Sequence, residues 1–66
     1  MDLLTTAEAA QYLNVPIGTL HYWRSMGTGP NSMKLGRRVM YRRDALDEFV
    51  LQQERFAAQL GAEAAR

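Results

Sequence analysis

The sequence lacks cysteine and contains a single histidine, His21. Without thiols the chain can form neither a disulfide nor a thiolate zinc site. His21 has no second histidine or cysteine with which to complete a metal site. There is also no glycine-rich phosphate loop, and no evident pairing of a nucleophile with a general base, as covalent catalysis requires. We therefore expect a protein that is not an enzyme and that needs no cofactor.

Long hydrophobic runs are also missing, because none approaches the roughly 20 apolar residues of a membrane-spanning helix. The 66 residues leave room for one domain only, which we expect over 1–66. A chain of this length buries only about 60% of its unfolded surface. Its hydrophobic content of 47% must supply the core. These features predict one small cytoplasmic domain.

Acidic residues are absent from the central segment, residues 21–43, which holds six of the eight Lys and Arg. The preceding twenty residues carry net −2, and the following twenty-three carry five acids against two arginines, net −3. The formal charge of +1 (−2 + 6 − 3) therefore conceals a strongly basic segment between acidic flanks. Such a segment is typical of a protein that binds a polyanion.

A first helix is predicted from about Thr6 to Asn14. Thr5 and Glu8 have the spacing of a capping box at its start. Asn14 tolerates the left-handed conformation that ends many helices. Ala9, Ala10 and Leu13 share one face, and the two alanines would allow another helix to approach closely.

A second helix is predicted from Pro16 to Ser25, ahead of Gly27. Leu20 and Trp23 lie on its inward side, so we interpret Trp23 as a core residue and not as a wedge between bases. Two short helices joined by a tight turn predict a helix-turn-helix at about residues 5–26. In such motifs the second helix enters the major groove of DNA.

The segment 32–42 predicts a β-hairpin. A three-residue loop at residues 36–38 would place Leu35 opposite Val39 and Met33 opposite Tyr41, all on one face. A two-residue loop would instead pair Leu35 with a charged residue and mix the faces. The hydrophobic pattern favours the three-residue loop. With either loop, two arginines lie at the hairpin tip, as in a wing.

A last helix is predicted over about residues 43–60, with Gly61 as its end. Acidic residues in its first turns suit the positive end of the helix dipole, which explains them without catalysis. Phe56 and Leu60 continue its apolar stripe. We expect them to fold back over Leu3, Leu4 or Tyr12. The alternative is that they form an exposed stripe for a partner or a second copy.

The order of these motifs resembles a known family. The chain reads L-T-T-A-E-A-A-Q-Y-L-N-V-P-I-G-T-L-H-Y-W, then a loop, then L-G-R-R-V-M-Y-R-R-D-A-L-D-E-F. This pattern, over about residues 3–50, resembles the small excisionases among MerR-like winged-helix domains, including those of mycobacteriophages. Larger MerR regulators carry T-[IL]-R-Y-Y-E where this chain has Thr19 to Arg24, with His21 in place of the first arginine.

The resemblance implies a mainly α winged helix-turn-helix with a small β-hairpin, and a role in phage recombination. Such a protein binds double-stranded attachment-site DNA in the bacterial cytoplasm and directs an integrase toward excision. Further copies bind adjacent sites. A small transcriptional regulator of the MerR or AlpA type would look similar, and a protein-interaction module is a third possibility.

The candidate DNA-binding residues combine the outward side of the second helix with the cations of the hairpin. A cation on a hairpin tip is suited to phosphates or to a narrow minor groove. A helix side chain can reach base edges, and a glycine lets the backbone approach the duplex. The candidates are Gly18, Thr19, His21, Tyr22, Arg24, Ser25, Lys34, Arg37, Arg38 and Arg42.

Overall fold

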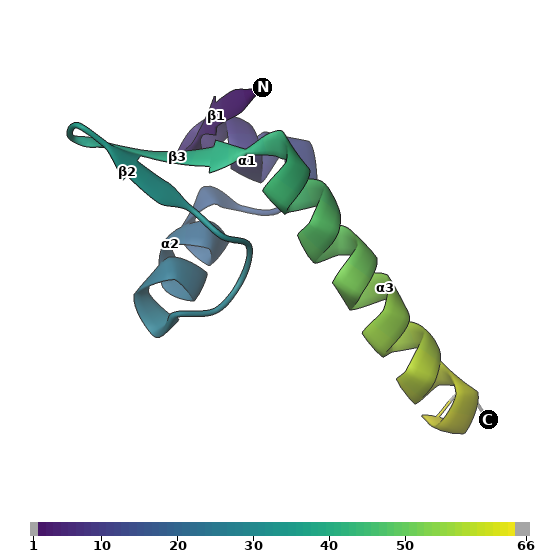
Figure 1. The fold of residues 1–66 in the computed structure, drawn as a ribbon. Coiled ribbons are helices and arrows are strands. Elements are labelled where there is room, and N and C mark those ends of the chain that lie inside the picture. The colour runs from purple at the N-terminus through teal and green to yellow at the C-terminus, as the bar shows by residue number, and fades with distance from the viewer. Residues whose placement is uncertain (1, 65–66) are drawn as a thin grey trace.

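The computed structural model describes the backbone of residues 2–64 and the side chains of residues 2–61. Three helices accompany a small antiparallel sheet whose hairpin projects from one edge of the molecule (Figure 1), so the predicted winged helix-turn-helix is confirmed. None of the described helices is long and apolar enough to cross a membrane. The elements are β1 (Leu3–Thr5), α1 (Thr6–Leu13), α2 (Ile17–Met26), β2 (Met33–Leu35), β3 (Arg38–Arg42) and α3 (Arg43–Ala64).

Helix α1 begins and ends as its sequence predicts. The Thr5 N–H donates to Glu8 Oε1 at 2.9 Å, and the Glu8 N–H donates to Thr5 Oγ1 at 3.1 Å, which completes the capping box. Asn14 follows with a φ of 60°, in the left-handed region. Both helix ends are therefore satisfied by side chains or backbone close in sequence.

Helix α2 follows after a short turn and lies within one residue of its predicted bounds. Pro16 is its N-cap, and Gly27, with a φ of 74°, is its C-cap. Leu20 is fully buried on the inward side. The Trp23 ring packs against that core, with its centroid 5.3 Å from the Phe49 ring of α3. Trp23 therefore packs against the core, as predicted, and its contact with Phe49 also joins α2 to α3.

The sheet contains a strand that the sequence analysis did not predict. Strand β1 pairs with β3, so the strand order is β1-β3-β2. Leu4 lies opposite Tyr41, and Thr5 opposite Met40. Directly after β1, Thr5 becomes the N-cap of α1, so β1 leads straight into the helix-turn-helix.

The predicted hairpin register is wrong by one residue. Leu35 pairs with Arg38, and Lys34 pairs with Val39, so the loop contains only Gly36 and Arg37. Gly36 has a φ of 61° at the first loop position, as a type II′ turn requires. Because paired residues share a face, Lys34 lies on the face of Val39 and Tyr41. The outer face carries Met33, Leu35, Arg38, Met40 and Arg42.

The core draws at least one residue from each of α1, α2, β3 and α3. Ala9, Leu20 and Leu46 are completely buried, and Tyr41 is nearly so. Leu4, Leu13, Val15, Trp23 and Val39 pack around them. The small side chains of α1 allow α2 to approach closely, which fixes the angle at which α2 is presented.

Helix α3 is longer than predicted and leaves the body of the protein. It continues past Gly61 to Ala64, because a glycine inside a helix lowers stability without ending the helix. Phe56 is 58% exposed and Leu60 is 48% exposed, so the expectation that they fold back on the body is wrong. Figure 1 shows the second half of α3 projecting away from the other elements. Phe56 and Leu60 instead form the exposed apolar stripe of the alternative interpretation.

Candidate nucleic-acid interface

The outward face of α2 is formed by four of the candidate residues. Gly18, His21, Tyr22 and Ser25 have the spacing i, i+3, i+4, i+7, which places them on one face of a helix. All four are exposed, and Tyr22 is 62% exposed. The face carries no acidic residue, so nothing on it repels a phosphate backbone.

Two further candidates flank this face of α2. Thr19 is half-buried on one side and Arg24 is exposed on the other. The Arg24 side chain borders a small hollow of about 180 Å³ together with the loop of residues 27–32. Arg24 is therefore positioned beside that loop, at the margin of the outward face of α2.

Three cations of the hairpin are exposed and have no ion-pair partner among the described residues: Lys34, Arg37 and Arg38. Arg37 lies in the two-residue loop itself, at the tip. Lys34 lies on the sheet face that packs against the helices, whereas Arg38 lies on the opposite face. The tip therefore presents positive charge in more than one direction.

The remaining two cations of the basic segment face acidic partners. Arg42 Nη2 lies 3.6 Å from Asp44 Oδ2, and Arg43 Nη2 lies 3.1 Å from Asp2 Oδ2. Arg42 is also four residues along β3 from Arg38, roughly 13 Å in an extended strand. The structure thus brings Lys34, Arg37 and Arg38 together and leaves Arg42 apart from them.

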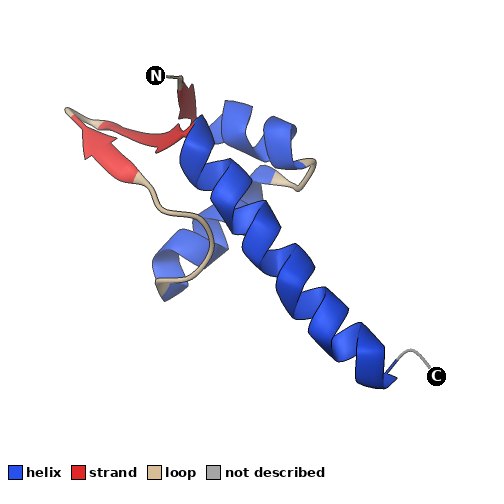
Figure 2. Cartoon of the chain, turned by 45° about the vertical axis from the view of Figure 1, so that its right-hand side comes forward, coloured by secondary structure: helices blue, strands red, loops and turns tan. Residues whose placement is uncertain are grey.

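The hairpin and α2 lie on the same side of the molecule. In Figures 1 and 2 the hairpin tip lies at the upper left and the end of α2 at the lower left, whereas α3 projects to the lower right. A helix for the groove and a basic tip for the backbone are the two parts with which winged helix-turn-helix proteins contact a duplex. Among the described cations without an acidic partner, Arg24, Lys34, Arg37 and Arg38 belong to these two parts, and the fifth, Arg55, lies on α3.

The structure adds surface residues that the sequence reasoning missed. Met26 is 59% exposed at the end of α2, one turn from Tyr22, where it adds apolar surface next to the outward face. Asn31 and Ser32 line the same hollow as Arg24. Their polar side chains, directly after a Gly-Pro turn, were the available signal in the sequence.

Comparison with known proteins agrees with this geometry. No curated protein and no solved structure matches the chain. A family model described as a helix-turn-helix domain matches residues 3–54, which include both helices, the hairpin and the first half of α3. The protein therefore belongs to this family of helix-turn-helix domains, and it binds DNA.

Proposed function

We propose that this protein is an excisionase: it binds attachment-site DNA and directs an integrase toward excision of an integrated element. Within a bacterial cytoplasm it acts as an architectural partner and performs no chemistry itself. The resemblance of residues 3–50 to the small MerR-like excisionases supports this role. The observation that carries DNA binding is the acid-free face of α2 beside unpaired cations on one side of the molecule.

In the proposed complex, α2 lies in the major groove. Tyr22 and Thr19 contact base edges or the adjoining phosphates, and Gly18 lets the helix backbone come close to the duplex. A Cβ added at Gly18 would meet nothing within 4 Å in the protein, so the fold itself does not require glycine there. His21 and Ser25 complete this contact surface.

The wing and its neighbours supply affinity without sequence information. Arg37 at the tip, with Lys34 and Arg38 beside it, binds phosphates or enters a narrow minor groove. Arg24 binds a phosphate from the other side of α2. Arg42 joins this set only if it exchanges Asp44 for a phosphate.

A single module of this size covers little DNA, which argues for several copies on adjacent sites. One small DNA-binding module buries about 600–1,000 Å² of protein surface on DNA. Linked or adjacent binding events raise the apparent affinity without new base contacts. Cooperative loading, with bending of the duplex between copies, would give an integrase a reshaped attachment site.

The test is an excision assay with purified protein, an integrase and DNA carrying the attachment sites of that integrase. We expect excision to depend on the protein and integration to be unaffected or inhibited. A small transcriptional regulator would instead bind a promoter and leave recombination unchanged, which would overturn the proposal. An integrase gene beside the coding sequence is the observation that most simply separates these two functions.

A titration tests the assignment of base reading to α2. Tyr22→Ala and Thr19→Ala should narrow the difference in affinity between attachment-site and scrambled duplexes, by about 1–3 kcal/mol per lost base contact. The matched control is Arg37→Ala, which should weaken binding to both duplexes alike. Preserved selectivity in both α2 variants would show that another element reads the sequence.

A further inference from the structure

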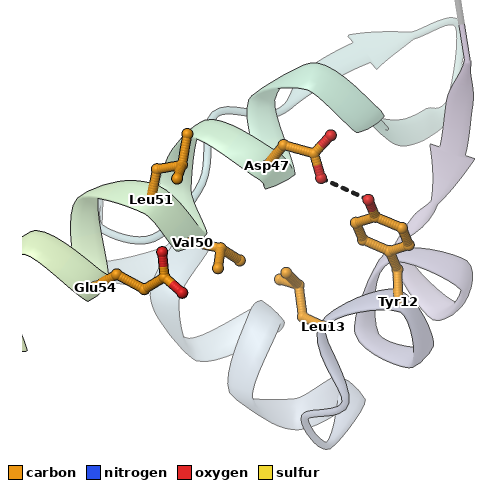
Figure 3. A pocket seen from close by; sticks show the side chains of 6 residues that line it. All are labelled: Tyr12, Leu13, Asp47, Val50, Leu51 and Glu54. Carbon is orange, nitrogen blue, oxygen red and sulfur yellow. Dashed lines mark hydrogen bonds between the residues drawn. The ribbon is translucent and has the colours of Figure 1, made fainter.

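A groove that DNA binding does not use lies between the end of α1 and the middle of α3. It has a volume of about 590 Å³ and is lined by Tyr12, Leu13, Asp47, Val50, Leu51 and Glu54. Figure 3 shows Tyr12 and Leu13 of α1 facing Asp47 and Val50 of α3, with Leu51 and Glu54 further along α3. Tyr12, Val50 and Leu51 are 47%, 40% and 45% exposed, so the groove offers apolar surface to solvent.

The charges in this groove have one sign. Asp47 and Glu54 are its ionisable acids, and no Lys or Arg is among the lining residues. The Tyr12 hydroxyl donates to Asp47 Oδ1 at 2.5 Å, which fixes one wall of the groove to the other. That hydrogen bond to the Asp47 carboxylate raises the pKa of Tyr12. The Glu54 carboxylate makes no ion pair or side-chain hydrogen bond with the described residues, so its charge is available to a ligand.

The groove remains accessible when α2 and the hairpin are on DNA. Figures 1 and 2 place α1 and α3 on the side of the body away from the hairpin tip. Every acidic side chain that the structure describes lies at Asp2, on α1 or on α3, whereas α2 and the hairpin carry none. The two acids of this groove would repel a polyanion such as DNA. A purely apolar helix would leave the charges of the same acids without partners.

We propose that this groove binds a short basic, amphipathic segment of a partner protein, with an arginine or lysine at Glu54 and Asp47 and aliphatic side chains against Val50 and Leu51. This inference rests on the proposed function, in which that partner is the recombinase acting on the same DNA. The positive charge of such a segment is complementary to the negative charges of Asp47 and Glu54. The apolar floor accommodates the few anchor side chains that dominate such small interfaces.

A second copy of this chain is the weaker choice of occupant. Four cations of the basic segment lack an ion-pair partner among the described residues: Arg24, Lys34, Arg37 and Arg38. All four are at the DNA-facing side, so a copy bound to DNA has none of them to offer. One further exposed cation of the described residues lacks an ion-pair partner: Arg55, which follows Glu54 of the groove directly on α3.

The test uses two variants of the groove and one matched control. Glu54→Lys reverses the charge in the groove, and Leu51→Ser removes apolar surface from it. Glu48→Lys makes the same charge change on α3, at a residue that does not line the groove and whose side chain accepts a hydrogen bond from Gln52. All three residues are exposed, so thermal melts should confirm that the variants fold like the wild type.

The first probe is a fluorescein-labelled helical peptide with leucines on one face and arginines beside them. We expect Glu54→Lys and Leu51→Ser each to weaken its binding at least about tenfold, or about 1.4 kcal/mol, and Glu48→Lys to have little effect. Equal losses in Glu48→Lys would indicate attraction to overall charge and would overturn the proposal. So would the absence of peptide binding to the wild type.

The second probe is the recombinase itself, in the excision assay. We expect Glu54→Lys to lose stimulation of excision while its DNA affinity is unchanged. If the wild type stimulates excision and Glu54→Lys does so equally, the groove is not the recombinase contact. If the wild type itself fails to stimulate excision, the proposed function fails, and the peptide titration still decides on the groove. Loss of cooperative DNA loading without recombinase would make a second copy the occupant and overturn our choice.

Discussion

At the scale of single residues, Gly29 allows the loop between α2 and the wing to pack closely against Trp23. Its φ is +80°, and a Cβ built there would lie 2.8 Å from the Trp23 Cβ. The loop can therefore pass over the Trp23 ring only because residue 29 has no side chain. Pro30, the next residue, is buried, and β2 begins three residues after it.

Gly29→Ala should accordingly destabilise the protein. The left-handed conformation and the overlap with Trp23 predict a loss of about 1–3 kcal/mol in the free energy of unfolding. Urea denaturation followed by tryptophan fluorescence measures it. Gly18→Ala is the control, because its Cβ meets nothing within 4 Å and alanine favours the helix, so stability should hold or rise by up to about 1 kcal/mol. Equal stability of both variants would mean that the loop moves away from Trp23.

The hydrogen bond between Tyr12 and Asp47 contributes to the stability of the folded state, and this contribution depends on pH. The hydrogen bond to the Asp47 carboxylate raises the pKa of Tyr12 above its ordinary value of 10.0. Because the folded state binds this proton more tightly, the stabilisation is fully present below the ordinary tyrosine pKa. It is lost as the pH rises through the raised pKa.

Melting temperatures of the wild type and Tyr12→Phe, measured from neutral to strongly alkaline pH, check this expectation. The wild type should be the more stable at neutral pH, and the difference should disappear at alkaline pH as Tyr12 ionises. The effect should be modest because Tyr12 is exposed. A difference that stays constant across the tyrosine titration would show that the hydrogen bond does not persist in solution.

At the scale of elements, α3 combines a packed first half with an unsupported second half. Leu46 and Phe49 anchor it to the body, whereas every residue from 51 to 60 is exposed. The molecule measures 47 × 24 × 19 Å, elongated as expected for a helix that projects from a small body. A helical segment of this length without tertiary contacts is only marginally stable in water.

Ending the chain after Gln53 should therefore change the stability of the body little, by less than about 0.5 kcal/mol. Thermal melts followed by near-ultraviolet circular dichroism report on Trp23 and its surroundings and are blind to the lost helical turns. A clear fall in melting temperature would mean that Phe56 or Leu60 folds back on the body in solution. If stability is unchanged but stimulation of excision or cooperative DNA loading is lost, the segment after Gln53 serves to bind a partner.

The elements also show where prediction from sequence succeeds and fails. The caps of α1 and α2 were predictable because Thr5, Glu8, Asn14 and Gly27 act on backbone within a few residues. The hairpin register was not, because the apolar pattern of β2 and β3 taken alone favours the three-residue loop, whereas the structure has the two-residue loop. What the pattern omits is β1: Leu4 joins the inner face opposite Tyr41, so Met33 and Leu35 are not needed in the core.

The candidate site was predictable to the same extent. Helical spacing alone separates the outward face of α2 from Leu20 and Trp23, and the structure agrees. Sequence could not show that Arg42 and Arg43 face Asp44 and Asp2, since these pairs depend on β1 and on the junction of β3 with α3. It also could not show the groove between α1 and α3, whose walls come from residues 35 positions apart.

At the scale of the whole molecule, charge is separated between two sides, and the formal +1 says little about DNA binding. If only the net charge mattered, about one counterion would be released on binding. If the whole basic segment bound phosphates, about six would be released. The structure indicates an intermediate number, because two of the six cations already have acidic partners.

This count predicts the salt dependence of binding to random duplex DNA. Four unpaired cations, each contributing about 0.9, give a slope near −3.6 in a plot of log affinity against log salt concentration. Arg37→Ala should reduce the magnitude of the slope by about 0.9, whereas Arg42→Ala should leave it nearly unchanged because Arg42 is paired with Asp44. Fluorescence anisotropy titrations at several salt concentrations measure all three slopes. A wild-type slope beyond about −5, with equal effects of the two substitutions, would show that DNA displaces Asp44 and Asp2 and recruits the whole basic segment. A slope near −1 would exclude the wing as an anchor, since phosphate contacts by Lys34, Arg37 and Arg38 alone require about −2.7.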